Sequence, residues 1–86
     1  MKSYLSCLIA LIAVAANASE SSCYSIQNTD SKNYCLARAK QQKSYCYSIR
    51  ESDTKNLCLA QVDHQKSHCY SIRSSDTKNM CLATFR

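Results

Sequence analysis

The chain has 86 residues and a net charge of +5, with 11 Lys and Arg against 6 Asp and Glu, and it contains seven cysteines but no glycine or proline. A chain of this length forms one domain at most, and its acidic residues recur near the basic ones, which argues against a nucleic-acid-binding stripe. So many cysteines in so short a chain are typical of a disulfide scaffold in an oxidising compartment.

The first 18 residues have the pattern of a secretory signal peptide. One lysine precedes an apolar run over residues 5–16, and an A-x-A cleavage pattern ends at Ala18. A membrane anchor would need about 20 apolar residues, so this run is too short to span a bilayer. We therefore expect cleavage near Ala18, which removes Cys7 and leaves a secreted or periplasmic chain, residues 19–86, with six cysteines.

The remaining cysteines mark an internal repeat. Their spacing alternates between 12 and 11 residues, which gives a period of 23. Each copy keeps Cys-Tyr-Ser-Ile, then an aspartate, then Lys-Asn, and finally Cys-Leu-Ala. Repeated supersecondary units of this length stack on one another and bury a common core. We divide the mature chain into three units, 23–45, 46–68 and 69–86.

Each unit is expected to form a short helical hairpin. The chain lacks the glycine-rich turns and the alternating apolar pattern of a β protein, so helices are favoured. The first helix is centred on Ser-x-Cys-Tyr-Ser-Ile, with Ser44 or Ser67 as its N-cap. The second helix runs to about Lys40 in the first unit and Asp63 in the second. Its N-caps in the three units are expected to be Asp30, Asp53 and Asp76.

The lack of glycine bears on the turns. Backbone turns that need a positive φ angle are therefore expected to be made by Asn, Asp or Ser, or to be avoided. The polar stretch from Arg50 to Asp53 is predicted to be the turn between the two helices of the middle unit. Helices this short are not stable in water alone, and the supply of apolar residues is small, so the fold needs covalent support.

Disulfides within each unit are the favoured source of that support. Pairing within units treats every cysteine alike, whereas pairing between units leaves Cys23 and Cys81 without a neighbour. A bridge that closes a loop of about a dozen residues contributes about 3 kcal/mol. The predicted fold is all-α, with three stapled hairpins stacked as a small solenoid. The predicted disulfides are Cys23–Cys35, Cys46–Cys58 and Cys69–Cys81.

Metal binding and catalysis find little support in the sequence. Structural zinc sites usually contain two cysteines a few residues apart, whereas the nearest cysteines here are 11 residues apart. His64 and His68 have the spacing of one helix face, but they occur in one unit only and are interpreted as surface residues. His68 beside Cys69 is also the only base next to a cysteine. We predict no metal site, no cofactor and no enzymatic activity.

One tyrosine and one lysine occupy the same place in every unit. The tyrosine ring could pack between units with its hydroxyl in water, or the two residue types could form a ladder of aromatic and basic groups that binds a partner. Both interpretations stay open at this point. The candidate binding face consists of Tyr24, Tyr47, Tyr70, Lys32, Lys55 and Lys78.

Three functions are compatible with these features. The first is a non-catalytic binding module for an unidentified extracytoplasmic protein, for example an inhibitor or an immunity-type partner, because stacked units present extended surfaces. The second is a secreted cationic membrane-active peptide, although no segment joins a strongly apolar face to a densely basic one. The third is thiol-based metal or redox handling, which requires free thiols. No nucleic acid and no small-molecule substrate is expected, and membrane contact belongs to the second hypothesis alone.

Overall fold

A computed structural model describes residues 20–85, and these residues form helices and loops without a strand. The predicted helical fold class is therefore confirmed. The segment expected to be a signal peptide, residues 1–18, lies outside the described residues. After a helical turn at residues 20–23, the elements are α2 (Thr29–Lys40), α3 (Ser44–Tyr47), α4 (Ser52–Val62), the 3-10 helix η1 (Lys66–Ser71) and α5 (Ser75–Ala83).

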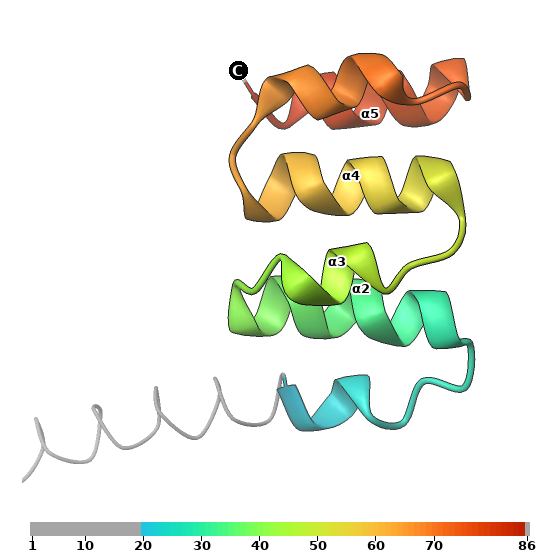
Figure 1. The fold of residues 1–86 in the computed structure, drawn as a ribbon, viewed down its shortest axis with the longest axis vertical. Coiled ribbons are helices and arrows are strands. Elements are labelled where there is room, and N and C mark those ends of the chain that lie inside the picture. The colour runs from blue at the N-terminus through green and yellow to red at the C-terminus, as the bar shows by residue number, and fades with distance from the viewer. Residues whose placement is uncertain (1–19, 86) are drawn as a thin grey trace, which may run out of the picture.

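The helices lie across the long axis of the molecule, one above the other (Figure 1). The order along this axis follows the chain, from the helical turn at the bottom of the view to α5 at the top, with α3 in front of α2. The loops that precede α2, α4 and α5 all lie on the right-hand side of the view, and the connections that follow α2 and α4 lie on the left. None of the helices in the described part of the chain has the length and apolar character needed to cross a membrane.

Three disulfides connect each short helical segment to the longer helix that follows it. The bridges are Cys23–Cys35, Cys46–Cys58 and Cys69–Cys81, with Cα atoms 5.5 to 5.6 Å apart. This is the pairing within units, and every bridge spans 12 residues. Five of the six cysteines are fully buried, so the sulfur atoms supply much of the core that a chain with few large apolar residues needs.

The apolar side chains form two clusters, one on each side of α4. The first joins Ala37 of α2 to Ile49, Leu59 and Val62, with the rings of Tyr34 and Tyr45 packed against it. The second joins Ala60 of α4 to Cys69, Ile72 and Cys81. Ala37 and Ala60 are both fully buried, because their small side chains let the next segment approach the helix closely.

The expected N-caps of the longer helices are wrong by two residues. Asn28, Glu51 and Ser74 cap α2, α4 and α5, and the side chain of each accepts a backbone N–H from the first turn. The Glu51 carboxylate also accepts the hydroxyl of Thr54, and this bond is the largest cause of its lowered pKa, followed by the backbone N–H groups of Thr54 and Asp53. The aspartates stand at the second helical position instead, where an acidic side chain is still favoured by the helix dipole.

These aspartates reach to the following unit. The carboxylate of Asp30 accepts the backbone N–H groups of Arg50 at 3.0 Å and Glu51 at 3.1 Å. The same bonds recur 23 residues later, where the carboxylate of Asp53 accepts the N–H groups of Arg73 at 2.9 Å and Ser74 at 3.0 Å. Each carboxylate therefore fixes the loop before the next long helix, a long-range role that sequence spacing alone did not reveal.

Because of these bonds, the protein should lose stability as Asp53 takes up a proton. The pKa of Asp53 lies below its ordinary value, first because of the backbone N–H of Arg73 and then because of that of Ser74. A carboxylate whose pKa is lowered by folding stabilises the native state above its unfolded pKa, and this contribution disappears as the pH falls through the native pKa. Thermal denaturation at a series of pH values should show a falling midpoint below about pH 4.

The variant Asp53→Asn provides the test of this assignment. It should have a lower melting midpoint at neutral pH and a weaker dependence of that midpoint on acid, because its side chain no longer titrates. Asp76→Asn is the matched control, since Asp76 is exposed and carries no such bond within residues 20–85. A wild-type acid dependence in Asp53→Asn would contradict the assignment.

The short helices also begin differently from the expectation. The N-caps of α3 and η1 are Lys43 and Gln65, and neither side chain makes a capping hydrogen bond. Ser44 and Ser67 lie inside the helical segments, so their assignment as caps is wrong. A disulfide and a buried isoleucine hold each of these short helices against the following helix, and this packing replaces the cap.

The left-handed turns are made by residues that the sequence did not indicate. Gln41 and His64, which end the turns after α2 and α4, both have φ of 55°. The expectation that Asn, Asp or Ser would take this conformation is wrong. At Gln41 the side-chain amide donates to the carbonyl of Arg38 at 2.8 Å, so it satisfies one of the free carbonyls of the helix end.

Candidate functional site

The three repeated tyrosines lie on the surface. Each follows a fully buried cysteine, and the exposed fractions of Tyr24, Tyr47 and Tyr70 are 56%, 60% and 62%. More than half of the surface of each of these residues is therefore in contact with solvent. Successive side chains of a helical turn point in different directions, so a cysteine that points inward leaves the next residue facing solvent.

The three repeated lysines are half-buried. Lys32, Lys55 and Lys78 lie in the first half of α2, α4 and α5, and their ammonium groups make no ion pair within residues 20–85. The two ion pairs of the described residues join Lys40 to Glu20 at 3.8 Å and Lys43 to Asp63 at 3.7 Å. The repeated lysines are thus available to an acidic partner, with their alkyl stems partly covered.

Two aromatic residues that differ between units have structural contacts. The hydroxyl of Tyr34 donates to Oε1 of Gln61 at 2.5 Å, and the guanidinium of Arg38 lies 5.5 Å from the centre of the Tyr34 ring. The ammonium of Lys40 lies 5.6 Å from the ring centre of Tyr45. Side-chain hydrogen bonding to Tyr45 is the largest cause of the raised pKa of Lys40. Both tyrosines also pack against the apolar cluster that joins the first unit to the second.

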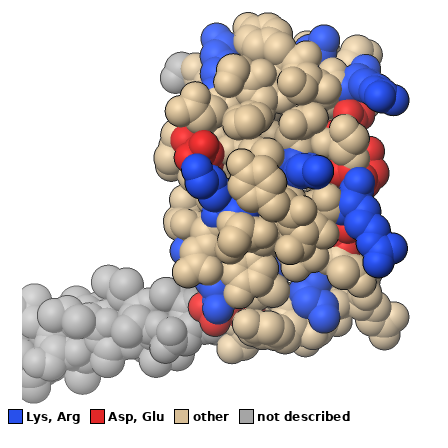
Figure 2. All heavy atoms as spheres, in the orientation of Figure 1, with Lys and Arg blue, Asp and Glu red and all other residues tan. Residues whose placement is uncertain are grey.

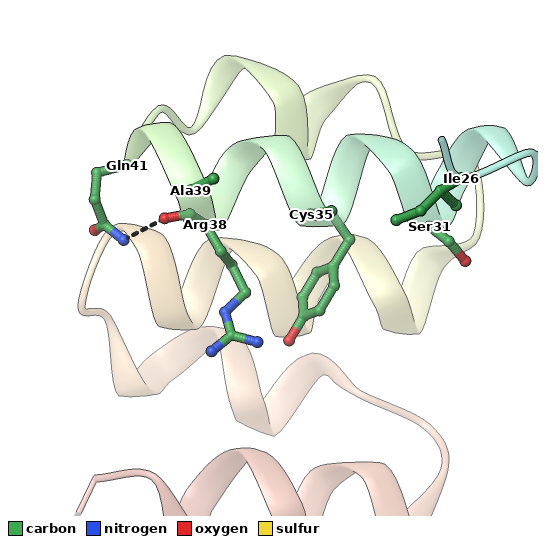
Figure 3. A pocket seen from close by; sticks show the side chains of 7 residues that line it. Ile26, Ser31, Cys35, Arg38, Ala39 and Gln41 are labelled. Atoms are coloured by element: carbon green, nitrogen blue, oxygen red, sulfur yellow. Dashed lines mark hydrogen bonds between the residues drawn. The ribbon is translucent and has the colours of Figure 1, made fainter. Parts of the chain in front are cut away.

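A depression of about 620 Å³ lies along α2 (Figure 3). The side chain of Arg38 extends from α2 toward the next helix, and its backbone carbonyl accepts the amide of Gln41. The depression is lined by Ile26, Ser31, Tyr34, Cys35, Arg38, Ala39 and Gln41.

A second depression of about 290 Å³ continues the first across the later helices. Arg38 and Gln41 belong to both, and the remaining lining residues come from the ends of α4 and α5 or from the turns after them. Among the described residues, the two linings contain a guanidinium, amides and hydroxyls but no Asp or Glu side chain. The second depression is lined by Arg38, Gln41, Gln61, His64, Thr84 and Phe85.

Comparison of the units did not reveal this groove. Arg38, Gln61 and Thr84 occupy equivalent places 23 residues apart, but their side chains differ in every unit. The residues shared by all units therefore include the exposed tyrosines but not Arg38, Gln61 or Thr84. The signal that could have located it is variation at a helix position where the neighbouring residues are kept.

Residues 20–85 contain neither a cluster of metal ligands nor a free thiol. No group of three or more His, Cys, Asp or Glu side chains in this range could hold a metal ion. The six cysteines of this range form three disulfides. His64 and His68 do not share a helix face, because His64 lies in the left-handed turn after α4 and His68 lies in η1.

The surface charge is mixed in sign. Figure 2 shows acidic and basic side chains next to each other along the edges of the visible face, while most of its centre is uncharged. Such a surface differs from the continuous basic stripe of a nucleic-acid-binding protein.

Comparison with known proteins identifies no relative, since no family model, curated protein or solved structure matches the chain.

Proposed function

We propose that this protein is a non-catalytic binding module that acts outside the cytoplasm and docks on another protein through Tyr24, Tyr47 and Tyr70. Three disulfides in a small helical domain are typical of an oxidising, extracellular environment. The signal-peptide pattern before Ala18 agrees with secretion or a periplasmic location.

The proposal includes a regular stack of the three units, a short solenoid. Its support is the recurrence of the aspartate bonds, since Asp30 and Asp53 each hold the loop that lies 20 and 21 residues further along the chain. The three disulfides recur with the same 12-residue span. Units related by one repeated movement place equivalent side chains in a row, so the tyrosines form a ladder on one side of the stack.

The exposure of these tyrosines is the single observation that carries the proposal. The exposed fraction of these residues lies between 56% and 62%, although this small chain has few aromatic residues for its core. Tyrosine is enriched in protein interfaces, where it supplies a large contact area at a low cost in side-chain entropy. The half-buried Lys32, Lys55 and Lys78 add charge, which favours a partner with acidic residues beside an apolar patch.

The test compares the oxidised protein with the triple variant Y24S/Y47S/Y70S in capture of extracytoplasmic proteins from the source organism. The wild type should retain a partner that the variant loses, because removal of a hot-spot tyrosine costs about 2 kcal/mol or more. Both proteins should melt at similar temperatures, since the rings are exposed. Q42S is the control, because Gln42 is exposed but belongs neither to the tyrosine ladder nor to an end of the stack.

Two results would contradict the proposal. Equal capture by the wild type and the triple variant would place the partner elsewhere, with the Arg38 groove as the next surface to vary. Salt-sensitive leakage of anionic vesicles without any captured protein would support the cationic membrane-active peptide instead. A captured partner that is inactivated by the protein would identify it as an inhibitor or immunity-type module.

A further inference from the structure

One end of the stack is formed by α5 and carries Asp76; we call it the Asp76 end. The carboxylates equivalent to Asp76 in the two earlier units accept hydrogen bonds from the next unit. Asp30 and Asp53 each accept two backbone N–H groups from the following unit. Asp76 occupies the same helical position in α5, but it is exposed and accepts no such bond within residues 20–85. Its carboxylate is therefore free to receive two N–H groups from another molecule.

Apolar side chains beside Asp76 are exposed at the positions that are covered in the earlier helices. Ala37 and Ala60 are fully buried under the next segment, whereas their counterpart Ala83 is exposed. Met80 is 63% exposed, while its counterpart Leu57 packs against the cluster around Ile72. This end of the stack thus lacks the polar outer face that usually closes an array of stacked units.

The opposite end presents the complementary groups. Ile49 and Ile72 are 1% and 2% exposed because each is covered by the preceding helix, but their counterpart Ile26 is only half-buried. The backbone N–H groups of Gln27 and Asn28 are the counterparts of those bound by Asp30 and Asp53 in the later units. Within residues 20–85 these two N–H groups donate no hydrogen bond.

We propose that the Asp76 end of one molecule docks on the Ile26 end of a second copy of this chain, head to tail. The contact repeats one that the chain already makes twice, in which a carboxylate binds two loop N–H groups and an isoleucine packs on a small helix face. Because the two surfaces differ, the association is heterologous and continues the stack instead of closing it. This inference does not depend on the tyrosine ladder.

Sedimentation equilibrium over a range of concentrations tests the proposal with two variants of the oxidised protein. M80E blocks the Asp76 end with a charge, and I26E blocks the Ile26 end. The weight-average mass of the wild type should rise with concentration, while each variant alone should associate at least about tenfold more weakly. A mixture of M80E and I26E should form heterodimers with one chain of each variant. In such a dimer the intact Asp76 end of I26E binds the intact Ile26 end of M80E.

The mixture separates this contact from a symmetric one. A wild type that stays monomeric at millimolar concentration would overturn the proposal. Association of the wild type without dimers in the mixture would also overturn it, because it would indicate an interface that uses the same surface on both copies. Thermal melting checks that both variants are folded, and if I26E is not, Gln27→Pro removes one N–H group while Ile26 is kept.

Discussion

Removal of the middle disulfide by C46A/C58A should lower the free energy of unfolding by about 3 kcal/mol or more. The bridge closes a loop of 12 residues, and the chain-entropy estimate for a loop of this length is about 3 kcal/mol. Both sulfur atoms also lie in the cluster that joins α2 to α4, so their removal leaves a cavity. A domain of this size has little stability to spare, and we expect it to be largely unfolded at physiological temperature.

Urea denaturation followed by far-UV circular dichroism measures this effect. The variant C69A/C81A is the matched control, because its loop has the same length but its cluster is covered on one side only. The chain-entropy contribution is equal in the two variants, so any difference between them reports the packing around each bridge. A smaller loss of unfolding free energy in C46A/C58A than in C69A/C81A would contradict a larger packing contribution of the middle disulfide.

The substitution Ile49→Ala should lower the free energy of unfolding by about 2–5 kcal/mol, the usual range for a fully buried isoleucine. Ile49 is 1% exposed and packs between Ala37 of the preceding helix and Leu59 of its own unit. Its loss leaves a cavity where two units meet, next to the loop that the Asp30 carboxylate holds.

Ile26→Ala is the control for this prediction, since Ile26 occupies the same place in the first unit but is only half-buried. Chemical denaturation of both variants at a protein concentration too low for self-association gives the comparison. The loss at Ile26 should be clearly the smaller of the two. Equal losses would mean that burial at the junction between units does not determine the stability of this fold.

Much of the candidate surface could be anticipated from the sequence, but its exposure could not. The recurrence of Tyr24, Tyr47 and Tyr70 is visible in the chain, whereas a buried and an exposed tyrosine look alike in a repeat pattern. The groove around Arg38 was missed for a different reason. Its lining brings together residues of three helices, and only the lateral packing of those helices makes them neighbours.

The sequence by itself determined the helical class, the regular spacing of the cysteines and the approximate ends of α2 and α4. Those features follow from local properties, namely the absence of glycine and proline, helical periodicity and the 23-residue period. The tertiary structure alone decided the roles of Asp30 and Asp53. A carboxylate near a helix start can cap its own helix or bind a loop that is 20 residues away, and the choice depends on which N–H groups packing brings within 3 Å of it.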